Sequence, residues 1–129
     1  MNKQSDTTFR AVGDKINQYL DDRDWRPTKQ RGRSIAISIS LEANELLEHF
    51  QWQDKADGSN EELSDELADI MIYCFQFAEA YDIDMSKAIQ NKLKKQEKKY
   101  LAKLFKGKKN AHDDWLNVKI AHNKEKDTL

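Results

Sequence analysis

Hydrophobic residues recur along the chain at the three- and four-residue spacing of an amphipathic α-helix. The segments with this period cover residues 9–22, 34–50, 59–81 and 85–104. Isoleucines alternate over residues 35–39 as in a strand, but the residues that follow continue in the helical period. Pro27 and Gly32 separate the first two segments, and Ser59 with Glu62 three residues later is a capping pattern that starts a helix. The pattern predicts an all-α fold, a bundle of four helices.

The two ends of the chain lack this pattern. Residues 1–6 are mostly polar, and the chain from Lys106 onward is polar and poorly periodic. We expect both ends to be irregular, with the C-terminal end ordered only by a ligand or a partner subunit. We therefore predict one helical domain over residues 1–109 and a polar tail over residues 110–129.

Composition limits the class of protein. Of the 129 residues, 38% are hydrophobic and 35% are charged, so a monomer has a thin core. No apolar run approaches the roughly 20 residues that span a bilayer, and no N-terminal signal pattern is present. The single cysteine, Cys74, falls in an apolar helical stripe and excludes a disulfide framework. We expect a soluble, cytoplasmic protein without a membrane partner.

Charge is unevenly distributed. The net charge of -1 combines an acidic stretch over residues 42–69 with a lysine-rich stretch over residues 87–109. Such an arrangement suits a polyphosphate held through a metal on one side and by cations on the other. It equally suits two solvated helix faces, so charge alone does not decide between them.

Two acidic pairs share one spacing. Glu42 and Glu45 lie three residues apart on the second predicted helix, and Glu66 and Asp69 are spaced in the same way on the third. Residues at this spacing share a helix face, and each pair borders the apolar stripe along which helices pack. Antiparallel packing of the two helices would bring the four carboxylates together. An all-oxygen site of this kind suits Mg²⁺ or Mn²⁺.

Two other interpretations of the acidic pairs have to be weighed. Glutamate is a strong helix former that fills exposed positions of any charged bundle, so the spacing alone leaves a surface-charge interpretation open. A di-iron carboxylate site requires a Glu-x-x-His motif on two helices. His49 lies four residues after Glu45, and the third helix has no counterpart.

The two acidic stretches resemble a known family. Residues 40–52 read SLEANELLEHFQW, and residues 61–73 read EELSDELADIMIY. They are similar to the MazG-like and dCTP pyrophosphatase group of all-α nucleotide pyrophosphohydrolases, which carries an ExxE pair and an ExxD pair on successive helices. Arg-Asp-Trp at residues 23–25 and Lys-Lys-Tyr at residues 98–100 resemble further elements of the group, with Leu101 where the family has proline.

The resemblance implies hydrolysis of a (deoxy)nucleoside triphosphate between the α and β phosphates, yielding monophosphate and pyrophosphate, for control of the nucleotide pool. It implies a Mg²⁺ ion, or Mn²⁺ in its place, that neutralises the phosphates and orients the attacking water. One of the metal-binding carboxylates would act as the catalytic proton acceptor. The residues with these roles are Glu42, Glu45, Glu66 and Asp69.

The resemblance also implies substrate contacts and a subunit arrangement. Aromatic residues would line the base pocket, because aromatic faces stack on any nucleobase. These residues are Trp25, Trp52 and Tyr73, and the residues that would reach the phosphates from one helix face are Lys92, Gln96 and Lys99. Members of the family are often tetrameric, so we expect a homodimer or a homotetramer.

Two non-enzymatic functions remain as alternatives. The first is a helical module that binds a nucleic acid or a protein through the lysine-rich segment 87–109, with nucleic acid the less expected of the two partners. Salt-sensitive binding without metal-dependent turnover would indicate this function. The second is a structural oligomerisation bundle, in which the carboxylates are replaceable without functional loss.

Overall fold

The structure is a computed structural model, and it describes residues 7–107 and 111–127. In these ranges the regular secondary structure is helical. The elements are α1 (Phe9–Asp21), a 3-10 turn η1 (Lys29–Arg31), α2 (Gly32–Glu48), α3 (Asn60–Ala80), α4 (Met85–Lys99), α5 (Ala102–Phe105) and α6 (Ala111–Asp127). No strand occurs in these ranges, so the predicted all-α fold is confirmed.

Two compact units divide the chain, residues 1–85 and residues 86–129. The predicted limits of the helical domain, residues 1 and 109, stay a prediction. The expected irregular conformation of residues 1–6 concerns residues outside the described ranges. No helix in the described part of the chain is both long enough and apolar enough to cross a membrane.

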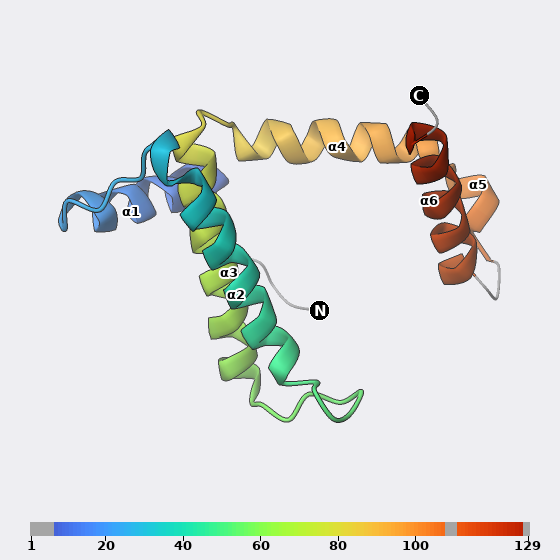
Figure 1. Cartoon of the computed structure of the whole chain (residues 1–129), viewed down its shortest axis with the longest axis horizontal. Helices are drawn as coiled ribbons and strands as arrows, with labels where there is room; N and C mark the ends of the chain where they lie inside the picture. The colour runs from blue at the N-terminus through green and yellow to red at the C-terminus, as the bar shows by residue number, and fades with distance from the viewer. Residues whose placement is uncertain (1–6, 108–110, 128–129) are drawn as a thin grey trace. The chain divides into compact units, whose positions relative to one another are not determined.

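The first unit is built on an antiparallel helix pair, α2 and α3, which lie side by side (Figure 1). α1 packs against α3. The buried hydrophobic residues among those described are Leu20 of α1, Ile35 of α2 and Ala78 of α3, each no more than 6% exposed. Leu20 and Ala78 lie near the ends of α1 and α3, and Ile35 lies near the start of α2. The core is therefore thin, as the composition predicts, and in the other half of the α2–α3 pair leucines such as Leu46 and Leu63 are only half-buried.

Side chains fix the starts of α1 and α3. The hydroxyl of Thr8 accepts a hydrogen bond from the N–H of Ala11 at 3.1 Å. The hydroxyl of Ser59 accepts from the N–H of Glu62 at 3.2 Å, and the carboxylate of Glu62 accepts from the N–H of Ser59 at 2.6 Å. This reciprocal pair confirms the capping pattern predicted before α3.

α1 and α3 end in the same way. Asp24 and Asp82 have left-handed backbones, with φ of 53° and 54°. The N–H groups of the following residues, Trp25 and Ile83, donate to carbonyl oxygens five residues earlier, at 2.9 and 2.8 Å. Aspartate tolerates this conformation better than most residues with a side chain. The left-handed residue turns the chain back across the last turn of each helix.

The connection between α1 and α2 is fastened to the end of α3. Arg26 pairs with Asp21 at 2.7 Å and with Glu79 of α3 at 2.6 Å. The hydroxyl of Tyr81 donates a hydrogen bond to the carbonyl oxygen of Lys29 at 3.4 Å. These contacts fix the point at which α2 begins.

In the second unit, the fourth helix is shorter than predicted. α4 ends at Lys99 rather than at Leu104. The ring of Tyr100 packs against Phe105 and Trp115, with centroid separations of 6.0 and 6.3 Å. These aromatic contacts fold the chain back after α4, so tertiary packing overrides the local helical period.

The expectation of an irregular tail is wrong for residues 111–127, because they form α6. Apolar and polar residues are mixed around this helix, so the sequence shows no helical period there, although its alanine, lysine and glutamate residues favour helix. α6 packs on α5. The remaining residues of the predicted tail, 110, 128 and 129, lie outside the described ranges.

Gly32 is a position at which a side chain does not fit. A Cβ atom there would collide with the ring and hydroxyl of Tyr81. We expect Gly32→Ala to lower the free energy of unfolding by about 1–3 kcal/mol, measured by urea denaturation.

Gly13→Ala is the matched control, because a Cβ atom there meets only the ring of Phe75 at 3.4 Å. Alanine is the better helix former, so this variant should keep its stability or gain up to about 1 kcal/mol. Equal losses in the two variants would contradict the close approach of Tyr81 to Gly32.

Candidate metal centre

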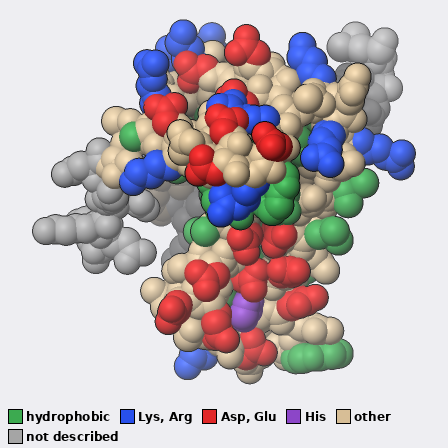
Figure 2. All heavy atoms as spheres, turned by 90° about the vertical axis from the view of Figure 1, so that its left-hand side faces the viewer, with side chains coloured by type: hydrophobic (Ala, Val, Ile, Leu, Met, Phe, Trp, Pro, Cys, Tyr) green, Lys and Arg blue, Asp and Glu red, His purple; other side chains and the backbone are tan. Residues whose placement is uncertain are grey.

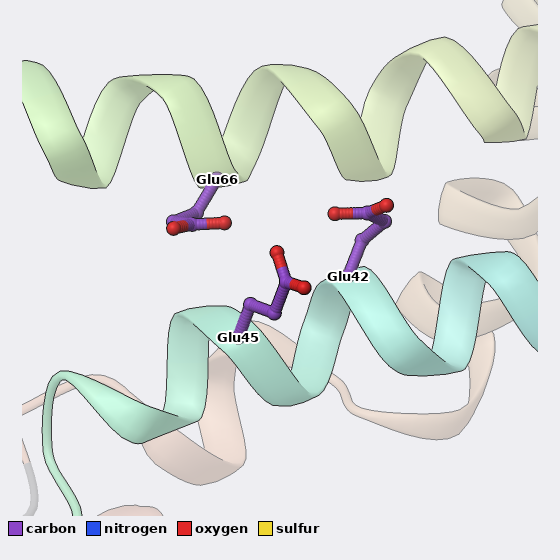
Figure 3. Close-up of side chains that lie close together, drawn as sticks. All are labelled: Glu42, Glu45 and Glu66. Atoms are coloured by element: carbon purple, nitrogen blue, oxygen red, sulfur yellow. The ribbon is translucent and has the colours of Figure 1, made fainter.

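Three carboxylates converge where α2 faces α3. Glu42 and Glu45 extend from α2 toward α3, and Glu66 extends from α3 toward α2 (Figure 3). One oxygen atom of each carboxylate lies within 4.8 Å of the others. Glu42 and Glu66 are half-buried, whereas Glu45 is exposed. The structure therefore brings together three of the four carboxylates of the predicted metal site.

Charge repulsion is built into this cluster. Burial, followed by the nearby charge of Glu45, raises the pKa of Glu42 above the ordinary value for glutamate. The charges of Asp69 and Glu66 act in the same direction. A hard divalent cation takes oxygen ligands and would remove this repulsion. The donor set therefore fits Mg²⁺ or Mn²⁺.

Asp69 lies apart from the other three carboxylates. Among the described residues, the mutually close oxygen atoms are those of Glu42, Glu45 and Glu66. Asp69 is exposed one helical turn after Glu66, and its charge still reaches Glu42. Asp69 also lines an adjoining cleft, so it connects the carboxylate cluster with that cleft.

This cleft has a volume of about 660 Å³ and lies among α1, η1 and α3. Its lining residues are Lys15, Ile16, Tyr19, Leu20, Trp25, Arg31, Asp69, Ile72, Tyr73 and Gln76. The volume falls within the usual range for small-molecule sites. Two of the aromatic residues predicted to line a base pocket, Trp25 and Tyr73, are thus in one cleft.

The position of Trp25 follows from the end of α1. The left-handed backbone of Asp24 turns the chain, and the indole ring lies edge-on to Tyr19 with centroids 6.3 Å apart. The guanidinium of Arg23 lies over the Tyr19 ring, 3.9 Å from its centroid. Trp25 remains 54% exposed. Its indole therefore retains accessible surface for stacking.

Trp52, the third aromatic residue predicted to contact a base, is not in the cleft. It lies in the connection between α2 and α3 and is 87% exposed. The structure of the single chain thus separates Trp52 from Trp25 and Tyr73. Its contact with a base stays a prediction.

His49 lies beside the carboxylate cluster. Its Nε2 atom is 3.6 Å from Oε1 of Glu66, and its Nδ1 atom is 3.5 Å from Oδ1 of Asp57. Figure 2 shows acidic side chains gathered on one face of the molecule, with a histidine among them. Sequence spacing relates His49 only to Glu45. The contact with Glu66 depends on the packing of α2 against α3, which spacing within one helix does not reveal.

The predicted phosphate-binding residues belong to the second unit. Lys92, Gln96 and Lys99 line a cleft of about 630 Å³ between α4 and α6, so they share one face of α4 as their spacing predicts. The other lining residues are Lys95, Tyr100, Trp115, Lys119, His122 and Asn123. The contribution of α6 was not predicted, because that segment was expected to be irregular.

Several residues of the first cleft were also missed. Gln76 lies seven residues after Asp69 and three after Tyr73, so the helical period itself indicates that these side chains share a face. No spacing in the sequence relates Lys15 or Arg31 to these residues of α3. Their positions depend on how α1 and η1 pack against α3.

Fold and site together define an all-α protein with a carboxylate cluster on a helix pair and an aromatic cleft beside it. The sequence profile of the MazG-like family matches residues 37–114, which is more than half of the chain. The chain belongs to the MazG-like family, and the resemblance inferred from the two acidic stretches is confirmed.

Curated relatives are dCTP pyrophosphatases. The chain is 26% identical over 98 residues to dCTP pyrophosphatase 1 of Rattus norvegicus, which covers 70% of this chain and 57% of that protein. It is 25% identical over 114 residues to the Mus musculus protein, and this match covers 82% of this chain and 66% of the mouse protein. It is 28% identical over 111 residues to the Bos taurus protein, and this match covers 80% of this chain and 65% of the bovine protein. The chain thus spans less than two thirds of the length of these relatives.

A solved structure has the same fold. The crystal structure of a pyrophosphatase from Archaeoglobus fulgidus matches with a TM-score of 0.64 and 28% sequence identity. The match covers 78% of this chain and 99% of the archaeal chain.

The raised pKa of Glu42 predicts a pH dependence for the metal-free protein. The folded state binds the Glu42 proton more tightly than the unfolded state does. The stability contributed by this group is therefore present at low pH and lost as the pH rises through the folded pKa. Above that pKa, in EDTA, we expect Glu42→Gln to melt at a higher temperature than the parent.

Glu48→Gln, an exposed change on the same helix, is the control and should shift melting little. A lower melting temperature for Glu42→Gln than for Glu48→Gln in EDTA would contradict repulsion within the cluster.

Proposed function

We propose that the chain hydrolyses nucleoside triphosphates between the α and β phosphates, releasing a nucleoside monophosphate and pyrophosphate. We further propose that it uses Mg²⁺, or Mn²⁺ in its place. The metal ligands in this proposal are Glu42, Glu45, Glu66 and Asp69. The dCTP pyrophosphatase relatives and the archaeal pyrophosphatase support this reaction class.

One observation carries the proposal. Close carboxylates from two helices lie near an aromatic cleft, and Asp69, whose charge reaches Glu42 of the cluster, lines that cleft. A metal site on its own would be compatible with many hydrolases. An aromatic cleft beside it suits a substrate with a flat, stackable group at one end and phosphates at the other, which describes a nucleotide.

The chain's own residues have separable roles in this reaction. Trp25 and Tyr73 hold the base in the cleft, and a carboxylate of the cluster accepts the proton of the attacking water. The oxygen atom of that water ends on one of the two products as the bond between the α and β phosphates breaks. A bound divalent cation supplies neutralisation of the phosphate charge and activation of the water.

Further binding roles are proposed for residues outside the first cleft. Lys92, Gln96 and Lys99 offer cationic and amide donors that suit phosphate oxygens. Trp52 offers an indole that is almost fully exposed in the single chain. An aromatic ring in that position is suited to stack on a base once a ligand or another subunit covers it.

Exposed hydrophobic residues support self-association. Ile37 and Leu41 of α2 and Leu67 of α3 are 49%, 59% and 54% exposed. Removing such side chains from water gains about 25 cal/mol per Å² of apolar surface. We therefore propose a homodimer or a homotetramer in which faces of the α2–α3 pair are covered.

The cleft of the second unit favours a second candidate function, a non-enzymatic binding module for phosphate-bearing ligands. Lys92, Lys95, Lys99 and Lys119 line this cleft, and none of them has a carboxylate partner among the described residues. Binding that weakens with salt, together with no metal-dependent turnover, would favour this function over hydrolysis.

The proposed reaction predicts a defined product. With Mg²⁺, the protein should release pyrophosphate rather than orthophosphate from at least one member of a panel of canonical and modified nucleotides, and excess EDTA should stop the reaction. Glu45→Gln and Glu66→Gln should each lower kcat/KM by more than about 100-fold, because each removes a proposed metal ligand. Glu48→Gln should retain the parent activity. Orthophosphate as the first product, or full activity in both ligand variants, would disprove the proposed reaction.

The proposed base pocket predicts a change in tryptophan fluorescence. Nucleotide binding should alter the emission of Trp25, because stacking changes the surroundings of its indole. The response should therefore be reduced in Trp25→Phe. The same titration of Trp52→Phe measures whether Trp52 takes part. An unchanged response in a Trp25→Phe, Trp52→Phe double variant would remove both residues from the pocket.

A further inference from the structure

His49 occupies a defined place between two acidic side chains from different elements. It follows the last residue of α2, and its ring nitrogens lie 3.5 Å from Asp57 in the α2–α3 connection and 3.6 Å from Glu66 on α3. The imidazole is only 17% exposed, and the Glu66 side chain is 23% exposed. Both nitrogen atoms are therefore directed at carboxylates in a partly enclosed setting.

The connection between α2 and α3 is folded onto this ring. The N–H of Asp57 donates to the carbonyl oxygen of His49 at 3.0 Å. A Cβ atom on Gly58 would lie 2.5 Å from Nδ1 of His49, so the backbone approaches the imidazole as closely as glycine allows. The capping pair of Ser59 and Glu62 then begins α3. The position of the ring is thus set by backbone contacts as well as by the two carboxylates.

Glu66 is the ligand of the cluster that most needs such support. Glu42 and Glu45 project from one helix, whereas Glu66 reaches the same point alone from α3 (Figure 3). A glutamate side chain has three rotatable bonds, and a neighbouring group that restrains it reduces the entropy lost when it binds a cation. Outer partners of this kind orient metal ligands and tune metal affinity.

We propose that His49 is a positioning residue that holds the carboxylate of Glu66 toward Glu42 and Glu45, and thereby sets the affinity of the cluster for a divalent cation. The inference rests on the proposed metal site and deepens it. α2 then supplies two ligands directly and restrains the third through the residue that follows its last turn. The nitrogen atoms of His49 do not belong to the group of mutually close ligand atoms found among the described residues, so His49 acts on the cation through Glu66.

Two amide substitutions distinguish the two arms of His49, which are the contact of Nε2 with Glu66 and the contact of Nδ1 with Asp57. The amide nitrogen of glutamine lies near the position of Nε2, so His49→Gln keeps a donor for Glu66. The shorter amide of asparagine lies near the position of Nδ1, so His49→Asn keeps only the arm toward Asp57. His49→Leu removes both arms, and Asn44→Leu, an exposed change on α2, is the matched control.

Mg²⁺ affinity is measured without nucleotide, from the rise in melting temperature with Mg²⁺ concentration. We expect the apparent Kd for Mg²⁺ to increase about 10- to 100-fold in His49→Asn and His49→Leu, and to stay within about threefold of the parent in His49→Gln and Asn44→Leu. Pyrophosphate release should show the same order in its Mg²⁺ half-saturation, with kcat largely restored at saturating Mg²⁺. A purely structural histidine would instead lower the metal-free melting temperature and leave the Kd unchanged.

The inference is overturned if His49→Asn binds Mg²⁺ as tightly as His49→Gln does. This comparison holds even if His49→Leu fails to fold. Failure of the proposed metal site gives a different result, because the parent protein itself would then show no Mg²⁺-dependent rise in melting temperature.

Discussion

The contact between α2 and α3 has to accommodate mutually repelling charges. Carboxylate oxygens of Glu42, Glu45 and Glu66 lie within 4.8 Å of one another at this contact, while the buried core is confined to a few residues near the opposite end of the pair. Other contacts therefore hold α2 and α3 in place against the repulsion between these carboxylates. They are the packing of the helices, the capped start of α3 and the ion pairs of the α1–α2 connection. The raised pKa of Glu42 is the local expression of that repulsion. A bound cation, as proposed, converts the same closeness from a destabilising feature into a binding site.

The sequence was sufficient to predict those features whose geometry depends on a single helix. The period of apolar residues located the helices of the first unit to within a few residues, and the three-residue spacing of Glu42 and Glu45 placed both side chains on the face that meets α3. The Ser59–Glu62 cap was readable for the same reason, because its hydrogen bonds are local. Such features depend on helical geometry and not on the rest of the fold.

The sequence was insufficient to predict contacts between segments that lie far apart along the chain. α4 stops at Lys99 because aromatic rings from α5 and α6 pack on Tyr100, and no local signal specifies those contacts. The placement of Asp69 toward the aromatic cleft, and of His49 against Glu66, likewise depends on how α3 and its preceding connection pack. The family resemblance supplied roles for aromatic residues, whereas the fold shows that Trp25 and Tyr73, but not Trp52, share a cleft within one chain.

The left-handed aspartates at the ends of α1 and α3 have a consequence for how this sequence can change over time. At Asp24 and Asp82 the backbone conformation costs a residue with a side chain about 1 kcal/mol, and glycine avoids that cost while losing a similar amount through its freer unfolded chain. The two effects nearly cancel, so aspartate and glycine are close to interchangeable there. A change of either aspartate to glycine should therefore leave the ends of α1 and α3 almost as stable as they are.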